Sequence, residues 1–198
     1  MPCCVPPDGS PLVAVLAAGS GSRFGGGKLD AMLAGKRVGR WVLDAVSEAG
    51  LAPGVIVTGA EAPDFARESD WTLAVNPKAE EGLGTSLAVA AGRALAQGQP
   101  LLVLLADMPL VSAEHLIALS NAGGASATVW SGGKSGVPAY FPLALLPQLA
   151  AFSGDAGAGA LLSGRVDVTR IIAPADMLVD VDTAEDLARA EELLSQRG

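Results

Sequence analysis

Glycines interspersed with two cations near the start of the chain have the composition of a phosphate-binding loop. Residues 19–27 contain five glycines in nine positions, with Arg23 inside this stretch and Lys28 directly after it. Glycines let backbone N–H groups close around phosphate oxygens without a Cβ in the way. A fixed cation then offsets the charge of a polyphosphate. The stretch therefore predicts that the chain binds phosphate groups.

One carboxylate stands where a metal ion that accompanies such phosphates would be expected. Asp107 follows the apolar run Leu101–Ala106 and precedes Met108 and Pro109. Proline cannot continue a strand ladder, so the carboxylate is expected just past the end of a strand. Magnesium is typically held by one or two carboxylates together with substrate phosphates. Asp107 is thus a candidate Mg²⁺ ligand, the alternative being an aspartate that merely opens a turn.

Strands and helices are expected to alternate along the chain and to position these residues. Expected strands are Leu12–Ala17, Val55–Thr58, Thr72–Val75, Leu101–Ala106, Ala125–Trp130 and Val137–Phe141. Expected helices run from Val38 to Gly50, from Thr85 or Ser86 as N-cap through Leu95, after Ser112 as N-cap, and over Thr183–Arg197.

Such alternation predicts an α/β fold: a single-domain, Rossmann-like three-layer α/β/α arrangement with a mostly parallel sheet. Ligands of such sheets bind at the carboxyl ends of the strands. The chemistry is therefore expected just after Ala17 and just after Ala106.

Composition narrows the class of protein. The 198 residues are expected to form one domain, with residues 1–11 as a flexible tail. No apolar run approaches the ~20 residues of a membrane span, and no secretory signal is visible. Cys3 and Cys4 are the only cysteines, so no intrachain disulfide framework is expected and a cytoplasmic location fits.

Charge is distributed unevenly. A net charge of −8 argues against a nucleic-acid partner, yet five of the thirteen Lys and Arg residues lie between positions 23 and 40. For Lys36, Arg37 and Arg40 we expect a solvated basic face. His115, the only histidine, is expected to be an exposed helical residue, which leaves no histidine-based hydrolase.

A dinucleotide-binding loop is the main alternative for the glycine-rich stretch. The pattern Gly19-x-Gly21-x-x-x-Gly25 resembles that fingerprint, which also requires an acidic residue about 20 positions further on. Here the second expected strand ends at Thr58, about 35 to 40 residues beyond the loop. A dinucleotide-dependent oxidoreductase is therefore disfavoured.

Longer segments resemble one family. The segment Leu16–Lys28, LAAGSGSRFGGGK, resembles the signature loop of the MobA-like nucleotidyltransferases, within the nucleotide-diphospho-sugar transferase fold. Leu104–Pro109, LLADMP, is similar to the family's strand that ends in Asp-Met-Pro. Three further segments match in family order: Glu81–Leu87, Gly154–Ala158 and Asp180–Leu187.

The resemblance implies a reaction in which an acceptor phosphate attacks the α-phosphate of a nucleoside triphosphate and releases pyrophosphate. It implies that loop amides and Arg23 hold the β- and γ-phosphates, and that Lys28 neutralises charge at the α-phosphate. Mg²⁺ would be held by Asp107 and, by resemblance, by Asp180, which follows an expected late strand Met177–Val179. Asp182 is expected to be a helix N-cap rather than a ligand.

The nucleotide-binding residues follow from the same matches. The implied set is Leu16, Ala17, Ala18, Gly19, Gly21, Arg23, Lys28, Gly82, Gly84, Thr85 and Ser86. Asn76, at the end of the third expected strand, is placed to hydrogen-bond the base.

The substrates are expected to be CTP and molybdopterin. Ala18 gives the loop the Ala-Ala-Gly sequence of the molybdenum cofactor cytidylyltransferases, whereas the guanylyl branch usually has Ala-Gly-Gly, so CTP is favoured over GTP. Val137 and Gly159 depart from the family pattern, which often has histidine and arginine there. The acceptor is therefore left open between molybdopterin and a sugar phosphate or another phosphorylated metabolite. A nucleotide-binding protein without turnover is a further alternative, against which the retention of Lys28 and Asp107 counts.

Overall fold

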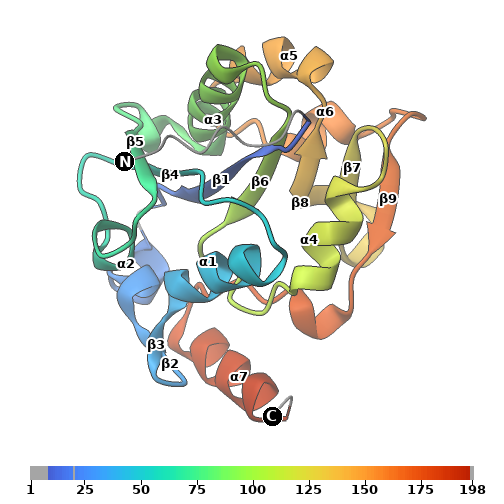
Figure 1. The fold of residues 1–198 in the computed structure, drawn as a ribbon. Helices are drawn as coiled ribbons and strands as arrows, with labels where there is room; N and C mark the ends of the chain where they lie inside the picture. The colour runs from blue at the N-terminus through green and yellow to red at the C-terminus, as the bar shows by residue number, and fades with distance from the viewer. Residues whose placement is uncertain (1–8, 20, 197–198) are drawn as a thin grey trace.

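A seven-stranded sheet forms the centre of the molecule (Figure 1). The structure, a computed structural model, describes residues 9–19 and 21–196; Cys3, Cys4 and most of the expected tail lie outside them. The strands are β1 (Leu12–Ala17), β4 (Val55–Thr58), β5 (Thr72–Val75), β6 (Leu101–Leu105), β7 (Ser126–Val129), β8 (Ser135–Phe141) and β9 (Thr169–Ile172). Their order is β5-β4-β1-β6-β8-β7-β9. Only β8 runs antiparallel to its neighbours within this sheet, so the expected α/β fold with a mostly parallel sheet is confirmed.

Helices cover both faces of the sheet and make three layers. They are α1 (Val38–Glu48), α2 (Asp64–Arg67), α3 (Leu83–Gln97), α4 (Ala113–Ser120), α5 (Leu146–Ala150), α6 (Ala158–Leu162) and α7 (Ala184–Ser195). Alternate residues of β1 enter the two opposite cores, as the period of a strand requires: Leu12, Ala14 and Leu16 face α3 and α5, while Val13, Val15 and Ala17 face α1. None of the described helices is long and apolar enough to cross a membrane.

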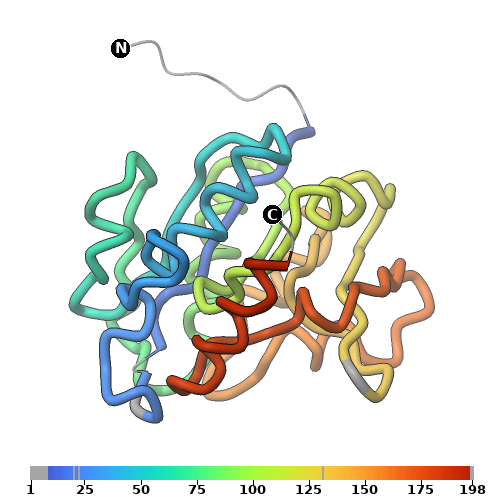
Figure 2. Tube along the Cα trace, turned by 90° about the horizontal axis from the view of Figure 1, so that it is seen from below, coloured from blue at the N-terminus to red at the C-terminus, as the bar shows by residue number. Residues whose placement is uncertain are grey.

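The C-terminal segment returns to the N-terminal part of the molecule. Val179, Val181 and Ala190 pack with Leu33 of the small sheet formed by β2 (Met32–Leu33) and β3 (Lys36–Arg37). Figures 1 and 2 both show this red segment beside the blue one. The fold therefore brings residues near position 180 next to the glycine-rich loop.

One expected helix start and one expected strand are wrong. Helix α3 begins at Leu83 with Gly82 as N-cap, not with Thr85 or Ser86, because Gly82 adopts a φ of 123° that breaks the helix there. Met177–Val179 is not a strand: Ala175–Met177 forms a 3₁₀ helix, and the sheet gains β9 instead. The apolar side chains of Val179 and Val181 are buried in the core beneath α7 and not in the sheet.

Two other helices begin where the sequence predicts. The hydroxyl of Ser112 accepts the N–H of His115 at the start of α4. Thr183 and Asp186 form a capping box at the start of α7.

His115 is not an exposed helical residue, which corrects the sequence expectation. It lies on the face of α4 that meets the sheet and is 7% exposed. Its Nε2 lies 2.8 Å from Oγ1 of Thr128, and this hydroxyl donates to the carbonyl oxygen of Pro138 at 2.7 Å. Since the single hydroxyl hydrogen is used there, Nε2 of His115 carries a hydrogen and donates to Thr128. Burial lowers the pKa of His115 below its ordinary value of 6.5.

We expect this histidine to make the protein sensitive to acid. Below about pH 6.5 the unfolded chain binds a proton that the folded protein does not, so the free energy of unfolding falls as pH falls, by at most about 1.4 kcal/mol per pH unit. Above that pH both states are neutral and the effect vanishes. His115→Gln, which cannot titrate, should lose less stability between pH 7.5 and 5.0 in urea denaturation. Parallel curves for the two proteins would contradict the prediction.

Candidate active site

Two adjoining hollows open at the carboxyl ends of the strands, the first beside β1 and β6 and the second beside β1 and β4. One has a volume of about 600 Å³ and the other about 560 Å³, and both are lined by Ala18 and Gly19 on one side and by Ala79 and Glu80 on the other. Asp107 lines the first hollow and Lys28 the second. This is the edge of the sheet where the sequence placed the chemistry.

The glycine-rich loop has a backbone that only glycine adopts readily. Gly21, Gly25, Gly26 and Gly27 all have positive φ, between 58° and 97°. A Cβ on Gly21 would stand 3.2 Å from Cγ of Lys28. The missing side chain therefore leaves the Lys28 stem room to lie against the loop.

Lys28 connects the loop to two carboxylates from distant parts of the chain. Its Nζ donates to Oδ2 of Asp107 at 2.6 Å and to Oδ1 of Asp182 at 2.7 Å. The lysine side chain is only 8% exposed. Burial by itself would lower the pKa of Lys28, but the charge and hydrogen bond of Asp107, joined by those of Asp182, raise it above its usual value. The ammonium group of Lys28 is therefore positively charged at neutral pH.

Asp182 belongs to this cluster, and its expected role as a helix N-cap is wrong. Thr183 caps α7, which leaves the Asp182 carboxylate to accept from Lys28 and from Nη1 of Arg23, the latter at 3.4 Å. The Arg23 side chain is otherwise 80% exposed. A signal for Asp182 existed in the sequence: residues i and i+2 of an extended segment share a side, so Asp182 accompanies Asp180.

Asp180 and Asp107 supply oxygens that suit a divalent cation. The N–H of Val181 donates to the carbonyl oxygen of Asp107 at 2.9 Å, which draws the two segments together. Oδ1 of each aspartate is buried and has no hydrogen-bond partner among the residues that the structure describes. Burial, and then the charges of Asp107 and Asp182, raise the pKa of Asp180 to about 7. Unpartnered, charge-crowded carboxylate oxygens of this kind are stabilised by a cation.

The protein alone offers too few ligands for a closed metal site. Within residues 9–19 and 21–196, no three His, Cys, Asp or Glu side chains converge to hold a metal ion. Two carboxylates completed by phosphate oxygens and water are the ligand set that magnesium prefers. The arrangement fits a metal that arrives with a polyphosphate.

The segment around Gly82 and Gly84, which is expected to bind the nucleotide, is tied to the loop that precedes α6. The N–H of Gly84 donates to the carbonyl oxygen of Gly154 at 2.8 Å. A Cβ on Gly82 would collide with the carboxylate of Asp155, and one on Gly84 would lie 2.8 Å from the Gly154 oxygen. Both glycines are therefore required by close packing of this loop, whatever they do for a nucleotide.

Asn76 lies behind the hollow rather than in its wall. The residue is 2% exposed, and its Nδ2 donates to Oγ1 of Thr85 at 2.8 Å and to Oγ of Ser86 at 2.9 Å. Its amide hydrogens are thus already used inside the protein and are not free for a base. Ser86, in contrast, lines the first hollow.

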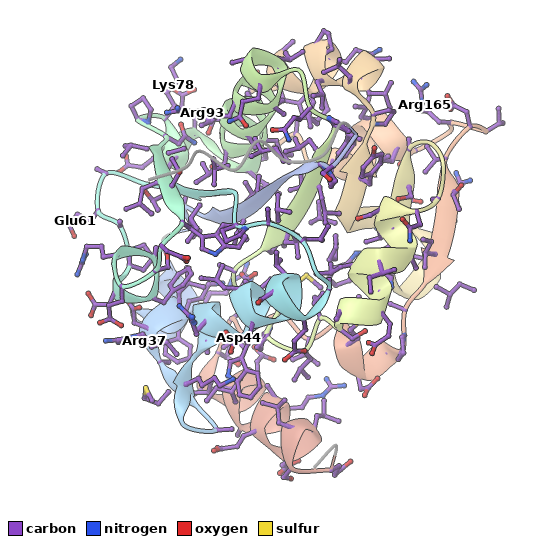
Figure 3. The ribbon with its side chains drawn as sticks, in the orientation of Figure 1. Arg37, Asp44, Glu61, Lys78, Arg93 and Arg165 are labelled. Carbon is purple, nitrogen blue, oxygen red and sulfur yellow. The ribbon has the colours of Figure 1, made fainter. Side chains whose placement is uncertain are left out.

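The remaining cations of the N-terminal cluster are matched by surface carboxylates. Lys36 and Arg40 pair with Asp44, and Arg37 pairs with Glu68 and Asp64. Figure 3 labels Arg37 and Asp44. The three cations lie at the surface, as expected, but as ion pairs rather than as an unpaired basic face. None of the three lines either hollow.

The two departures from the family pattern, at positions 137 and 159, have packing consequences. Val137 is buried in the core. A Cβ on Gly159 would stand 2.8 Å from the carbonyl oxygen of Ser135, because α6 lies against β8. An arginine at position 159 would therefore require α6 to move.

Comparisons with known proteins identify the family of the chain. Residues 13–170 match the model of the MobA-like NTP transferase domain. The purine catabolism protein PucB of Bacillus subtilis is 31% identical over 197 residues, which cover 91% of this chain and 95% of that protein.

Solved structures of other proteins share the fold of this chain. The homologue of Rv0371c from Mycobacterium sp. strain JC1 superposes with a TM-score of 0.77 at 25% identity, covering 94% of this chain and 98% of that one. Rv0371c of Mycobacterium tuberculosis, in complex with manganese, superposes with a TM-score of 0.68 at 25% identity over 92% of this chain and 98% of that one. The glycine-rich loop, strand β6 and Asp107 thus lie within a matched region spanning most of the sequence, and the chain belongs to the MobA-like NTP transferase family.

Proposed function

We propose that this nucleotidyltransferase moves CMP from CTP, with Mg²⁺, to a phosphorylated acceptor such as molybdopterin, and releases pyrophosphate in the cytoplasm. The observation that carries the proposal is the meeting of Lys28, Asp107 and Asp180 beside a loop of positive-φ glycines. Neither a membrane nor a nucleic acid takes part in it.

Each residue has a role in this reaction. An oxygen of the acceptor phosphate bonds to the α-phosphorus, and the bond from that phosphorus to the pyrophosphate oxygen breaks. Backbone amides of the loop and Arg23 hold the β- and γ-phosphates, and Lys28 offsets the charge that develops at the α-phosphate. Because phosphoryl-type transfer depends on positioning and charge stabilisation, no protein nucleophile is needed.

Asp107 and Asp180 would hold the Mg²⁺. When bound, the ion neutralises phosphate oxygens. The buried, unpartnered Oδ1 atoms of both aspartates support this assignment, as does the manganese bound to Rv0371c.

The acceptor is the least constrained part of the proposal. The resemblance favours molybdopterin, while Val137 and the close approach at Gly159 favour a different phosphorylated compound, such as a sugar phosphate. Pyrophosphate release, measured with CTP and each acceptor class in turn, decides between them. If no acceptor gives pyrophosphate release although CTP binds tightly, the result would instead favour a nucleotide-binding protein without turnover.

We expect the protein to bind CTP more tightly than GTP, by about tenfold, because the methyl group of Ala18 occupies space that the guanylyl branch leaves free for a purine. Equilibrium binding of both nucleotides with Mg²⁺ measures the preference. Ala18→Gly is the matched variant and should narrow the ratio. A clear preference of the unaltered protein for GTP would overturn the cytidylyl assignment.

A further inference from the structure

Asn76 is held in one orientation by its surroundings. Its backbone N–H donates to the carbonyl oxygen of Thr58 at 2.8 Å and continues the ladder of β5 on β4. Its Oδ1 accepts the N–H of Lys78 at 3.0 Å. The oxygen of the amide is thereby fixed, so the Nδ2 group must face Thr85 and Ser86.

This orientation determines what the two hydroxyl groups can do. An amide NH₂ only donates, so the oxygens of Thr85 and Ser86 both accept from it. The hydrogen of the Thr85 hydroxyl is directed at the carbonyl oxygens of Lys78 and Gly82, 2.9 and 2.8 Å away. The Ser86 hydroxyl has no acceptor for its own hydrogen among the described residues. Ser86 lines the larger hollow together with Leu16 and Ala18.

We propose that Asn76 is a positioning residue that keeps the Ser86 hydroxyl turned outward as a hydrogen-bond donor to the nucleobase. The inference rests on the proposed function, because it requires a nucleotide in this hollow. The matching chemical group is an acceptor on the base, which cytosine offers at N3 and O2. Asn76 thus sets the polarity of the base site without touching the base.

Two substitutions separate this role from a merely structural one. Ser86→Ala removes the donor. Asn76→Asp replaces the donating NH₂ by an accepting carboxylate, which draws the Ser86 hydrogen inward. Each should weaken binding of the α,β-methylene analogue of CTP, with Mg²⁺, by about tenfold in calorimetry, the effect of one lost hydrogen bond. The double variant should bind no more weakly than Ser86→Ala alone, because both changes remove one contact.

Inorganic tripolyphosphate is the second probe, since it has the phosphates but no base. Its affinity should stay within twofold in both variants, whereas a collapsed site would lose it. Ser126→Ala is the matched control: it removes another buried hydroxyl, which donates to Leu119, and should leave both affinities unchanged. Should Asn76→Asp fail to fold, Asn76→Ala takes its place in the same cycle.

The outcomes are distinct. If Ser86→Ala binds the CTP analogue normally, or if the effects of the two substitutions multiply, the positioning role of Asn76 is overturned while the proposed function stands. If the unaltered protein binds neither the CTP analogue nor the GTP analogue, the proposed function itself fails. If it binds only the GTP analogue, the same cycle is run on that nucleotide, whose O6 is also an acceptor.

Discussion

Asp107→Asn should lower metal-dependent turnover by about a thousandfold or more and leave the protein folded. A neutral amide is a much poorer magnesium ligand than a carboxylate, so the ion would be lost from its position against the phosphates. We expect the stability of the fold to change little. Asparagine serves turns as well as aspartate does, its oxygen can still accept from Lys28, and one of the charges that crowd Asp180 disappears.

The measurement is pyrophosphate release as a function of Mg²⁺ concentration, beside the melting temperature. Asp44→Asn is the matched control, since Asp44, labelled in Figure 3, is also an ion-paired aspartate but pairs with Lys36 and Arg40 and lines neither hollow. It should retain full turnover. Near-normal activity of Asp107→Asn would make Asp107 a structural residue and remove the metal site from the proposal.

Lys28→Ala is expected to have the second largest effect, a fall in kcat of about 100- to 1000-fold with a much smaller change in nucleotide affinity. The ammonium group is worth most where charge develops in the transition state, so its loss should appear in turnover. The substitution also leaves Asp107 and Asp182 without their shared partner in a partly buried setting. The melting temperature should therefore fall, and Mg²⁺ should restore part of it.

Lys36→Ala provides the comparison for Lys28, because Lys36 is a surface lysine that also forms an ion pair. Single-turnover kinetics and nucleotide binding should both be unchanged in it. Unaltered pyrophosphate release by Lys28→Ala would show that the contacts of Lys28 serve only the stability of the loop.

The central strands could be predicted because a buried strand appears in the sequence as a run of consecutive apolar residues. A parallel strand covered on both faces needs apolar side chains along most of its length, as in all of Leu12–Ala17 and in the first three residues of Val55–Thr58. The same composition misled at Met177–Val179, where apolar residues serve the core beneath α7 instead of a sheet. Apolar runs predict burial, and the partner that buries them decides the secondary structure.

The site residues were predictable only where a single short segment contains the pattern that identifies them. The loop, Lys28 and Asp107 each stand beside a local signal of glycines or of a strand end. Asp182 was misassigned because its partner Lys28 lies 154 positions away, and local spacing suggested a helix cap. His115 was misassigned for a related reason, since its partner Thr128 belongs to a strand that follows its helix.

The hydrogen bond from Gly84 to Gly154 joins the first turn of α3 to the loop before α6. A shift of one backbone segment is consequently also a shift of the other. If α3 adjusts to a nucleotide, and if the proposed acceptor meets the loop before α6, then that loop adjusts with α3 and the two ligands become thermodynamically linked. Linkage is reciprocal: whatever factor the nucleotide adds to the affinity for the acceptor, the acceptor adds to the affinity for the nucleotide. The order in which the two substrates bind would then alter the route to the ternary complex, but not its free energy.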